Sequence, residues 1–163
     1  MFHPPILRAA SELIVHCKKL SIRIATAESC TGGLIAGALT SISGSSAVFE
    51  RGFNTYSNQS KCDLLKLSSS EIDTFGAVSE QVAGQMAEGA LNNAPVQLTV
   101  AVTGVAGPEG GSLEKPVGTV HIASARLGQK TLNKRFLFKG DRHQVRIDTV
   151  SAAIDMMLQQ AHK

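Results

Sequence analysis

Short apolar runs alternate with segments of helical periodicity along the whole chain, and this alternation limits the fold more than any other feature. Residues 22–26 form a β-branched run, and residues 96–102 form an apolar run with the length of a buried strand. Residues 5–19 instead carry apolar side chains at helical spacing, with a proline tolerated in the first turn. Strands that alternate with helices pack as layers. The sequence therefore predicts a three-layer α/β/α fold with a mixed, mostly parallel sheet.

The same patterns, together with turn and capping residues, place the other elements. Further strands are predicted at residues 48–56, 117–125 and 131–138, the last two joined near Gly128. Further helices are predicted at residues 32–40, from Asn58, after a capping box at Ser68, from the cap Ser79 through Leu91, and after the cap Asp141. A chain of 163 residues without a long linker has the length of one domain, so residues 1–163 are predicted to form a single domain.

Composition excludes a disordered chain and gives little support to nucleic-acid binding. Hydrophobic residues make up 43% of the chain and charged residues 18%, which is enough apolar material for a full core. The net charge of +3, from 16 Lys and Arg against 13 Asp and Glu, is small and scattered. The absence of tryptophan and the single tyrosine leave few aromatic platforms for stacking bases. We therefore expect no nucleic-acid partner, and the mild positive charge fits an anionic small molecule.

The cysteines and the first residues of the chain indicate a reduced compartment. Cys17, Cys30 and Cys62 are an odd number without C-x-x-C spacing, which argues against a disulfide framework and a zinc knuckle. The first residues lack the basic and apolar segments of a signal peptide. The uncharged stretch of residues 29–49 is broken by Gly, Ser and Thr, so it lacks the character of a membrane span. We expect a soluble, cytoplasmic protein with no membrane partner.

Two loops that follow predicted strands carry the residue types needed for chemistry. Residues 26–33 read T-A-E-S-C-T-G-G and lead from a strand into a helix, whose first N–H groups can hold an oxyanion or a phosphate. Ser29 is a candidate nucleophile here, although serine caps helices far more often than it attacks a substrate. Residues 103–108 place Thr103 and Gly104 after another strand, where a glycine lets the main chain approach a ligand. A plain connecting turn is the alternative for this second loop.

A nucleophilic serine needs a base, and the sequence favours a lysine for that role. The chain contains no G-x-S-x-G elbow, P-loop, H-E-x-x-H or G-x-G-x-x-G motif. Its five histidines lie outside both loops, and His121 falls within a predicted strand, where a packed role is the default. Lys61 lies in the first turn of a predicted helix, where the helix dipole disfavours a cation and helps to keep the amine neutral. A solvated lysine is the alternative. Local spacing assembles no metal cluster, so we expect no metal and no cofactor.

Several blocks of the sequence occur together in one known family. In order, they are T-A-E-S-C-T-G-G at 26–33, R-G-F-N-T-Y-S-N at 51–58, G-A-V-S at 76–79, T-G-V-A-G-P at 103–108, E-K-P-V-G at 114–118 and G-D-R at 140–142. With these blocks the chain closely resembles the CinA C-terminal domain family of PncC-type nicotinamide-nucleotide amidohydrolases, from about residue 26 to residue 146. Val105 departs conservatively from the isoleucine that is common in the family. Longer relatives carry an additional N-terminal domain, whose activities do not transfer to this chain.

The resemblance implies a reaction and the residues that carry it out. The family hydrolyses the carboxamide of nicotinamide mononucleotide (NMN) to nicotinate mononucleotide and ammonia in pyridine-nucleotide recycling, which makes NMN the expected substrate. The serine of T-A-E-S-C-T-G-G is the family's nucleophile, here Ser29. Its lysine partner follows the Y-S-N segment, here Lys61, and the nearby tyrosine is Tyr56. On this basis Lys61 takes the Ser29 proton and returns it to the departing nitrogen, while Tyr56 orients Lys61 or relays a proton.

Substrate contacts are expected from the same loops. The main-chain N–H groups after Ser29, or those around Gly104, are the candidates for an oxyanion hole. The substrate phosphate needs donors, for which the loop at 44–46, the glycine-rich loop and Arg142 are candidates. Glu28 holds either Lys61 or a ribose hydroxyl, or else makes a structural hydrogen bond. The predicted substrate-binding residues are Glu28, Cys30, Thr31, Gly32, Gly33, Ser45, Thr103, Gly104 and Arg142.

Other interpretations stay open at the level of the sequence. Cys30 can replace Ser29 as the nucleophile because a thiolate is intrinsically stronger, although neighbouring side chains in a turn point in different directions. The domain can instead bind a nucleotide or a partner without catalysis, or hydrolyse a related pyridine or sugar amide. A homo-oligomer, dimer or trimer, is also expected, because a sheet of this size often pairs an exposed edge or buries a helix face.

Overall fold

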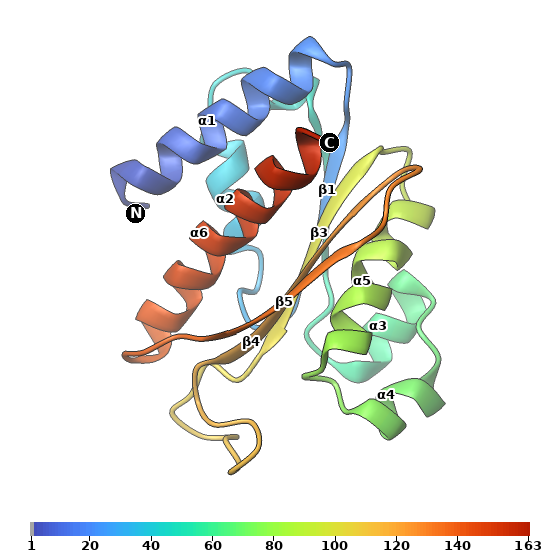
Figure 1. Ribbon diagram of the computed structural model, residues 1–163, viewed down its shortest axis with the longest axis vertical. Coiled ribbons are helices and arrows are strands. Elements are labelled where there is room, and N and C mark those ends of the chain that lie inside the picture. The colour runs from blue at the N-terminus through green and yellow to red at the C-terminus, as the bar shows by residue number, and fades with distance from the viewer. Residues whose placement is uncertain (1) are drawn as a thin grey trace.

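The computed structural model describes residues 2–163, which form one sheet with helices on both faces (Figure 1). The strands are β1 (Ile24–Glu28), β2 (Phe49–Asn54), β3 (Leu98–Gly104), β4 (Thr119–Arg126) and β5 (Leu132–Leu137), in the spatial order β2-β1-β3-β4-β5. β1 pairs in parallel with β2 and β3, whereas β4 pairs antiparallel with β3 and with β5. β4 therefore runs against the other strands. The predicted three-layer α/β/α domain with a mixed sheet is confirmed.

Helices cover the sheet in two groups. On one face lie α1 (Pro4–Lys19), α2 (Leu34–Thr40) and α6 (Arg142–Ala161), and on the other lie α3 (Asn58–Leu65), α4 (Ser69–Phe75) and α5 (Glu80–Asn92) (Figure 1). A short 3-10 helix, η1 (Ser45–Ala47), precedes β2. Within residues 2–163, each helix is too short or too polar to cross a membrane.

The parallel part of the sheet decides where the functional residues meet. Because β1, β2 and β3 point the same way, their carboxyl ends lie at one edge of the sheet, where Glu28 pairs with both Asn54 and Val102. In α/β proteins, ligands bind outside the carboxyl ends of such strands. The residues that follow these strands are therefore brought together, although they are far apart in the sequence.

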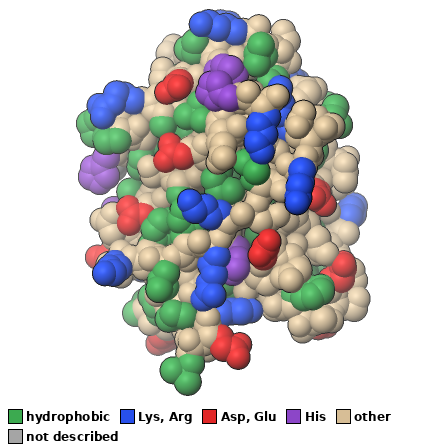
Figure 2. All heavy atoms as spheres, viewed as in Figure 1, with side chains coloured by type: hydrophobic (Ala, Val, Ile, Leu, Met, Phe, Trp, Pro, Cys, Tyr) green, Lys and Arg blue, Asp and Glu red, His purple; other side chains and the backbone are tan. Residues whose placement is uncertain are grey.

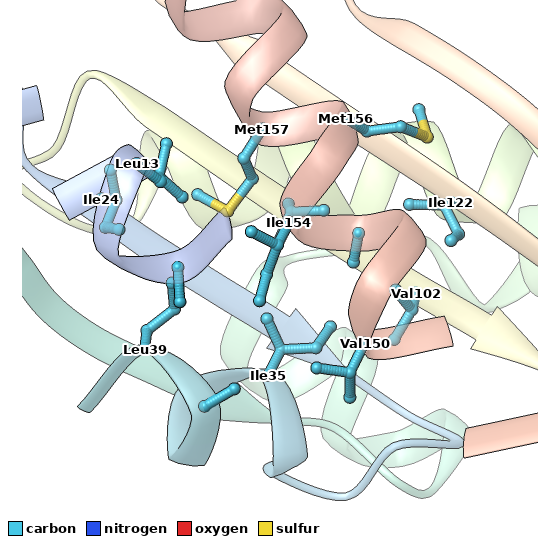
Figure 3. Close-up of a cluster of buried hydrophobic side chains, with 14 of the residues drawn as sticks. Leu13, Ile24, Ile35, Leu39, Val102, Ile122, Val150, Ile154, Met156 and Met157 are labelled. Atoms are coloured by element: carbon cyan, nitrogen blue, oxygen red, sulfur yellow. The ribbon is translucent and has the colours of Figure 1, made fainter. Parts of the chain in front are cut away.

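The two faces of the sheet are packed with side chains of different size. Branched side chains and methionines fill the space between the sheet and α1, α2 and α6, and Figure 3 labels ten of them. Alanines dominate the cluster beneath α5. Gly89 of α5 lies so near α3 that an added Cβ would collide with the Leu65 carbonyl. This close packing of α5 against α3 fixes α3 over the sheet.

The local capping signals at Ser79 and Asp141 are confirmed, whereas the capping box at Ser68 is wrong. The side chain of Ser79 accepts the N–H of the third residue into α5, and Asp141 accepts the corresponding N–H of α6. Ser68 does precede α4, but its side chain makes no cap bond. Its Oγ instead lies 2.7 Å from the Ser70 Oγ, so a neighbouring hydroxyl has taken the place of the helix N–H.

The boundaries of β1 and β3 also differ from the prediction. The pattern predicts strands at 22–26 and 96–102, but the strands span Ile24–Glu28 and Leu98–Gly104. The sequence pattern identifies the apolar and β-branched residues. Each of the two strands is hydrogen-bonded to a neighbouring strand on both sides, and this pairing extends each strand two residues beyond its predicted end. As a result, Ser29 directly follows β1, and Thr103 and Gly104 belong to β3 rather than to a loop.

Candidate active site

Ser29 is the first residue after β1, at the carboxyl edge of the parallel strands. Its N–H donates to the Val102 carbonyl of β3 at 3.1 Å, so Ser29 is still held to the sheet. The chain then turns into α2 through Gly32 at φ +60° and Gly33 at φ +98°, angles that glycine adopts without strain. The two glycines predicted to bind substrate therefore serve the turn itself, with Ser29 half-buried at its start.

Glu28 holds the same turn from below. Its carboxylate, 1% exposed, accepts the N–H groups of Gly33 at 3.0 Å, Ile35 at 3.0 Å and Ala36 at 2.8 Å. It also accepts the hydroxyl of the buried Thr31 at 2.7 Å. These N–H groups at the start of α2 have no helical partner, and a carboxylate there is favoured by the helix dipole. The sequence left open whether Glu28 holds Lys61, binds a ribose hydroxyl or makes a structural hydrogen bond. The structure shows structural hydrogen bonds, one of which comes from Thr31.

Lys61 reaches Ser29 from α3 on the opposite side of the turn. Its side chain is only 1% exposed, although it is a lysine. Its Nζ donates to the Thr55 carbonyl at 2.9 Å and to the Ser29 Oγ at 3.3 Å. Thr55 is itself fixed, since its N–H donates to the Glu28 carbonyl at 2.8 Å. The amine is therefore held beside the serine hydroxyl by a main-chain contact that is anchored to β1.

The surroundings of Lys61 favour its neutral form. Burial lowers the pKa of Lys61 below its usual value, while the nearby thiols of Cys30 and Cys62 act in the other direction. Among residues 2–163, no carboxylate forms an ion pair with this amine. Removing an ammonium from water without an acid beside it destabilises the charged form. A neutral Lys61 can accept the proton of Ser29, which is what a nucleophilic serine requires.

Cys30 lacks the properties of a nucleophile. Its side chain is 7% exposed and packs in the cluster beneath α6. Burial raises the pKa of the Cys30 thiol to about 12. Because only the thiolate attacks, a thiol with this pKa is almost entirely unreactive near neutral pH. The geometry therefore favours Ser29 over Cys30.

Arg146 of α6 also holds the turn, and the sequence analysis did not single it out. Its Nε donates to the Cys30 carbonyl at 3.2 Å, and its Nη2 donates to the Thr31 carbonyl at 2.8 Å. The signal available in the sequence was its position four residues after Arg142, one turn along the same helix face. The turn is thus fixed by a buried carboxylate from β1 and by a guanidinium from α6.

Tyr56 and Arg142 meet at the surface, away from the Lys61 amine. Tyr56 is 63% exposed, and its hydroxyl accepts a hydrogen bond from the Arg142 Nη2 at 3.1 Å. The Arg142 Nη1 donates to the Gly107 carbonyl at 2.8 Å. Arg142 therefore links the loop after β2 to the loop after β3. The Tyr56 hydroxyl contacts Arg142 rather than Lys61.

Thr103 and Gly104 lie at the end of β3 and are both held by packing. Thr103 is 1% exposed, and its Oγ1 donates to the Ala77 carbonyl at 2.7 Å. A Cβ on Gly104 would lie 2.7 Å from Val120 Cγ2 and 2.8 Å from the Thr119 carbonyl oxygen. Glycine is therefore required there by the neighbouring strand β4.

Ser45 does not lie with the other predicted residues. Ser45 lies in η1, which precedes β2. Directly after η1, the Val48 carbonyl accepts the N–H of Ile24, which is the first residue of β1. Because β1 and β2 are parallel, this places Ser45 at the amino edge of the sheet, opposite Ser29. Within one chain, Ser45 and Ser29 do not share a site, and the loop at 44–46 is not a phosphate donor for it.

Comparison with known proteins shows to which family the chain belongs. The sequence profile described as "CinA C-terminal domain" matches residues 7–161. The chain belongs to this family. It is 49% identical to the nicotinamide-nucleotide amidohydrolase PncC of Enterobacter agglomerans, over 84% of each chain. It is 46% identical to the PncC of Pseudomonas putida, over 95% of this chain and 96% of the relative. A CinA-like protein of Geotalea daltonii is 52% identical over 86% of this chain, which spans only 34% of that longer relative.

Solved structures of the CinA family share the whole architecture. The competence/damage-inducible protein CihA from Agrobacterium tumefaciens matches with a TM-score of 0.97 and 46% identity, over 100% of this chain and 99% of that one. A CinA superfamily protein from Escherichia coli matches with a TM-score of 0.90 and 36% identity, over 95% and 90% of the two chains. In this CinA C-terminal domain, the edge of the sheet brings Ser29 to Lys61 and pairs Tyr56 with Arg142.

Proposed function

We propose that this CinA C-terminal domain hydrolyses the carboxamide of NMN to nicotinate mononucleotide and ammonia. The observation that carries the proposal is the 3.3 Å contact between the Lys61 Nζ and the Ser29 Oγ, made by a lysine that is 1% exposed. Relatives that bear the name nicotinamide-nucleotide amidohydrolase support the choice of substrate, since two of them are 46% and 49% identical over most of their length.

The reaction divides into two steps that use the same pair of residues. Neutral Lys61 accepts the Ser29 proton while the Ser29 oxygen attacks the carboxamide carbon. The resulting lysine ammonium gives a proton to the leaving nitrogen, so that ammonia departs and an ester of Ser29 remains. In the second step, Lys61 takes a proton from water, water attacks the ester, and the proton returns to Ser29. The product is a carboxylate, and the enzyme is regenerated.

We assign the oxyanion to the main-chain N–H groups of Cys30 and Thr31. The N–H of Gly32 already donates to the Ser29 carbonyl, and that of Gly33 donates to Glu28. The N–H of Thr31 belongs to the peptide whose carbonyl oxygen is bound by Arg146. A cation on a carbonyl polarises its peptide unit and strengthens the N–H as a donor. Arg146 therefore acts on the oxyanion hole without touching substrate.

Tyr56, Arg142 and Thr103 receive binding roles in this proposal. We assign Tyr56 and Arg142 to the mouth of the site, where the exposed phenol ring packs on the substrate and Arg142 holds its hydroxyl. Thr103 lies next to Ser29 across β3 and β1, so it supports the floor of the site. We also propose a cytoplasmic location and a dimer or trimer, the latter supported by the edge strands β2 and β5, which expose their main chain.

The test is turnover of NMN without added metal, measured as ammonia and nicotinate mononucleotide. We expect both products from the wild-type chain and neither from Ser29→Ala or Lys61→Ala, with folding checked by circular dichroism. The exposed residues Ser43 and Lys18 provide matched controls, because Ser43→Ala and Lys18→Ala make the same changes far from the site.

Other outcomes point to specific alternatives. Folded wild-type protein that binds NMN without releasing ammonia would replace the enzyme with a binding module. An active Ser29→Ala variant that is inactivated by thiol alkylation would make Cys30 the nucleophile. Faster turnover of a related amide than of NMN would change the substrate but keep the mechanism.

A further inference from the structure

A pocket of about 550 Å³ lies at the same edge of the sheet as Ser29 but on the far side of Thr103. It is bounded by the start of α5 and by the loop between β3 and β4, and Lys115, His121 and Arg135 line it. The residues proposed for catalysis do not line it. Two sequence blocks that have no role in the proposed chemistry, E-K-P-V-G at 114–118 and G-A-V-S at 76–79, meet at this pocket. The Lys115 Nζ of the first block donates at 3.4 Å to the carbonyl of Phe75, which directly precedes the second block.

The pairing of the strands places this pocket at a fixed distance from Ser29. Ser29 follows Glu28, which pairs with Val102, so Thr103 is its neighbour on β3. Thr103 pairs with His121 on β4, and His121 pairs with Arg135 on β5. Neighbouring strands are roughly 4.8 Å apart, so His121 lies about 10 Å from Ser29 along this row.

Two cations are held at the pocket by the main chain and not by acids. Lys115 donates to Phe75, and the Arg135 Nη2 donates to the Glu114 carbonyl at 2.9 Å. In the part of the chain that the structure describes, neither side chain has a carboxylate within ion-pair distance. Each cation therefore keeps its full charge and further N–H donors for a ligand.

The pKa of His121 indicates which charges dominate around this side chain in the pocket. Burial lowers the pKa of His121, and the nearby charges of Arg135 and Lys115 lower it further, while Glu80 of α5 opposes them. Glu80 and Glu114 also line the pocket. Figure 2 shows Lys and Arg side chains together with a histidine and an acidic side chain over the middle of this face, where β5 lies in Figure 1. At His121 the two cations therefore outnumber the one opposing carboxylate, and this part of the pocket suits an anion.

We infer that this pocket binds a phosphate monoester through Lys115, Arg135 and His121. If the proposed function holds, on which this part rests, the bound group is the 5′-phosphate of NMN. A pyridine ring, a ribose and one methylene separate the carboxamide from the phosphorus, a span of about 10 Å by standard bond lengths. The main-chain row from Ser29 to His121 has a similar length, about 10 Å. Thr103, which lies between Ser29 and His121 in this row, donates to the Ala77 carbonyl at 2.7 Å, and we place the ribose beside it.

The decisive experiment compares NMN with nicotinamide riboside, which lacks the phosphate. For wild-type protein we expect kcat/KM to be higher for NMN. In Lys115→Met and Arg135→Met, the preference for NMN falls about 10- to 100-fold, the loss of one charged hydrogen bond. Lys134→Met is the matched control, since Lys134 is on the same strand but lies over Phe136 on the opposite face. An unchanged preference in the first two variants, or an equal loss in the control, overturns the inference.

A second measurement separates this inference from the proposed reaction. The His121 ring signal, identified by its loss in His121→Gln, is followed by NMR during titration with NMN or with inorganic phosphate. A bound phosphate dianion raises the pKa of His121, and we expect this upward shift with both probes. The shift with inorganic phosphate supports the pocket even if NMN is not hydrolysed. Hydrolysis of NMN without any shift of the His121 pKa keeps the reaction and refutes the phosphate site.

Discussion

Replacing Arg146 tests whether catalysis depends on how the turn after Ser29 is held. Arg146 donates to the Cys30 carbonyl at 3.2 Å and to the Thr31 carbonyl at 2.8 Å, and both bonds come from one planar guanidinium. A lysine keeps the charge, but its single amine cannot reproduce the pair of bonds. In Arg146→Lys one carbonyl loses its donor, and the peptide unit that presents the Thr31 N–H is less polarised and less firmly placed.

The expected size of the effect follows from these contacts. A hydrogen bond to a charged donor contributes about 1.5–3 kcal/mol. Arg146 is only half-buried, so the lower end of the range applies. A loss of about 1.5–2 kcal/mol in the stabilisation of the oxyanion lowers kcat roughly 10- to 30-fold. The KM for NMN changes little, because Arg146 is not assigned a contact with the substrate.

The assay is steady-state turnover of NMN, with urea unfolding measured in parallel. Arg126 supplies a close control, because its Nη1 donates to the Gln160 carbonyl at 3.0 Å and the Ala161 carbonyl at 2.8 Å, at the other end of α6. Because a single nitrogen of Arg126 makes both bonds, Arg126→Met is needed to remove them, and it should lower the free energy of unfolding but leave kcat unchanged. Equal kcat values in the two variants would show that Arg146 only stabilises the fold, and the reasoning would fail.

Four further predictions use other parts of the site. Because burial lowers the pKa of Lys61, kcat/KM should fall as the pH falls through that lowered value, and Lys61→Arg should be inactive at every pH tested. Between the lowered pKa of Lys61 and its usual value of 10.5, the unfolded chain binds more protons than the folded chain, so the free energy of unfolding should rise with pH in this window. Urea titrations at several pH values measure this rise, and Lys61→Met should abolish it. Glu28→Gln, which removes the charge at the start of α2, should cost about 1–3 kcal/mol in urea unfolding, and a loss below 0.5 kcal/mol would be too small for the contacts described. Cys30→Ala should retain turnover, and the Cys30 thiol should react slowly with iodoacetamide in native protein, since its pKa is about 12.

The fold was largely predictable because its signals are local. Apolar runs and helical periodicity give the order of the elements, and the caps at Ser79 and Asp141 are set by their own neighbours. The predictions for the strand ends and for the Ser68 cap were wrong because contacts outside the local sequence pattern determine them. The carboxyl ends of β1 and β3 depend on pairing with other strands, and the hydroxyl of Ser68 is taken by Ser70.

The candidate site was predictable only in part, because its contacts join distant segments. The link from Lys61 to Ser29 spans 32 residues, and spacing alone left a solvated lysine as the alternative. The role of Glu28 was left open because its partners lie up to eight residues later, and the sequence does not show that the turn brings the start of the predicted helix back over this carboxylate. Arg146 acts across 116 residues, and its place one helical turn after Arg142 was the signal that the sequence offered.

The attachment of the catalytic turn to α6 has a consequence during synthesis on the ribosome. α6 follows the other described elements in the chain, so Ser29 and Lys61 have long emerged when Arg142 and Arg146 are translated. Until α6 docks, the loops after β1, β2 and β3 lack the two arginines that join them. A nascent chain therefore carries Ser29 and Lys61 before it carries the arginines that hold the turn, and we expect the proposed hydrolysis only after α6 has been translated and has docked.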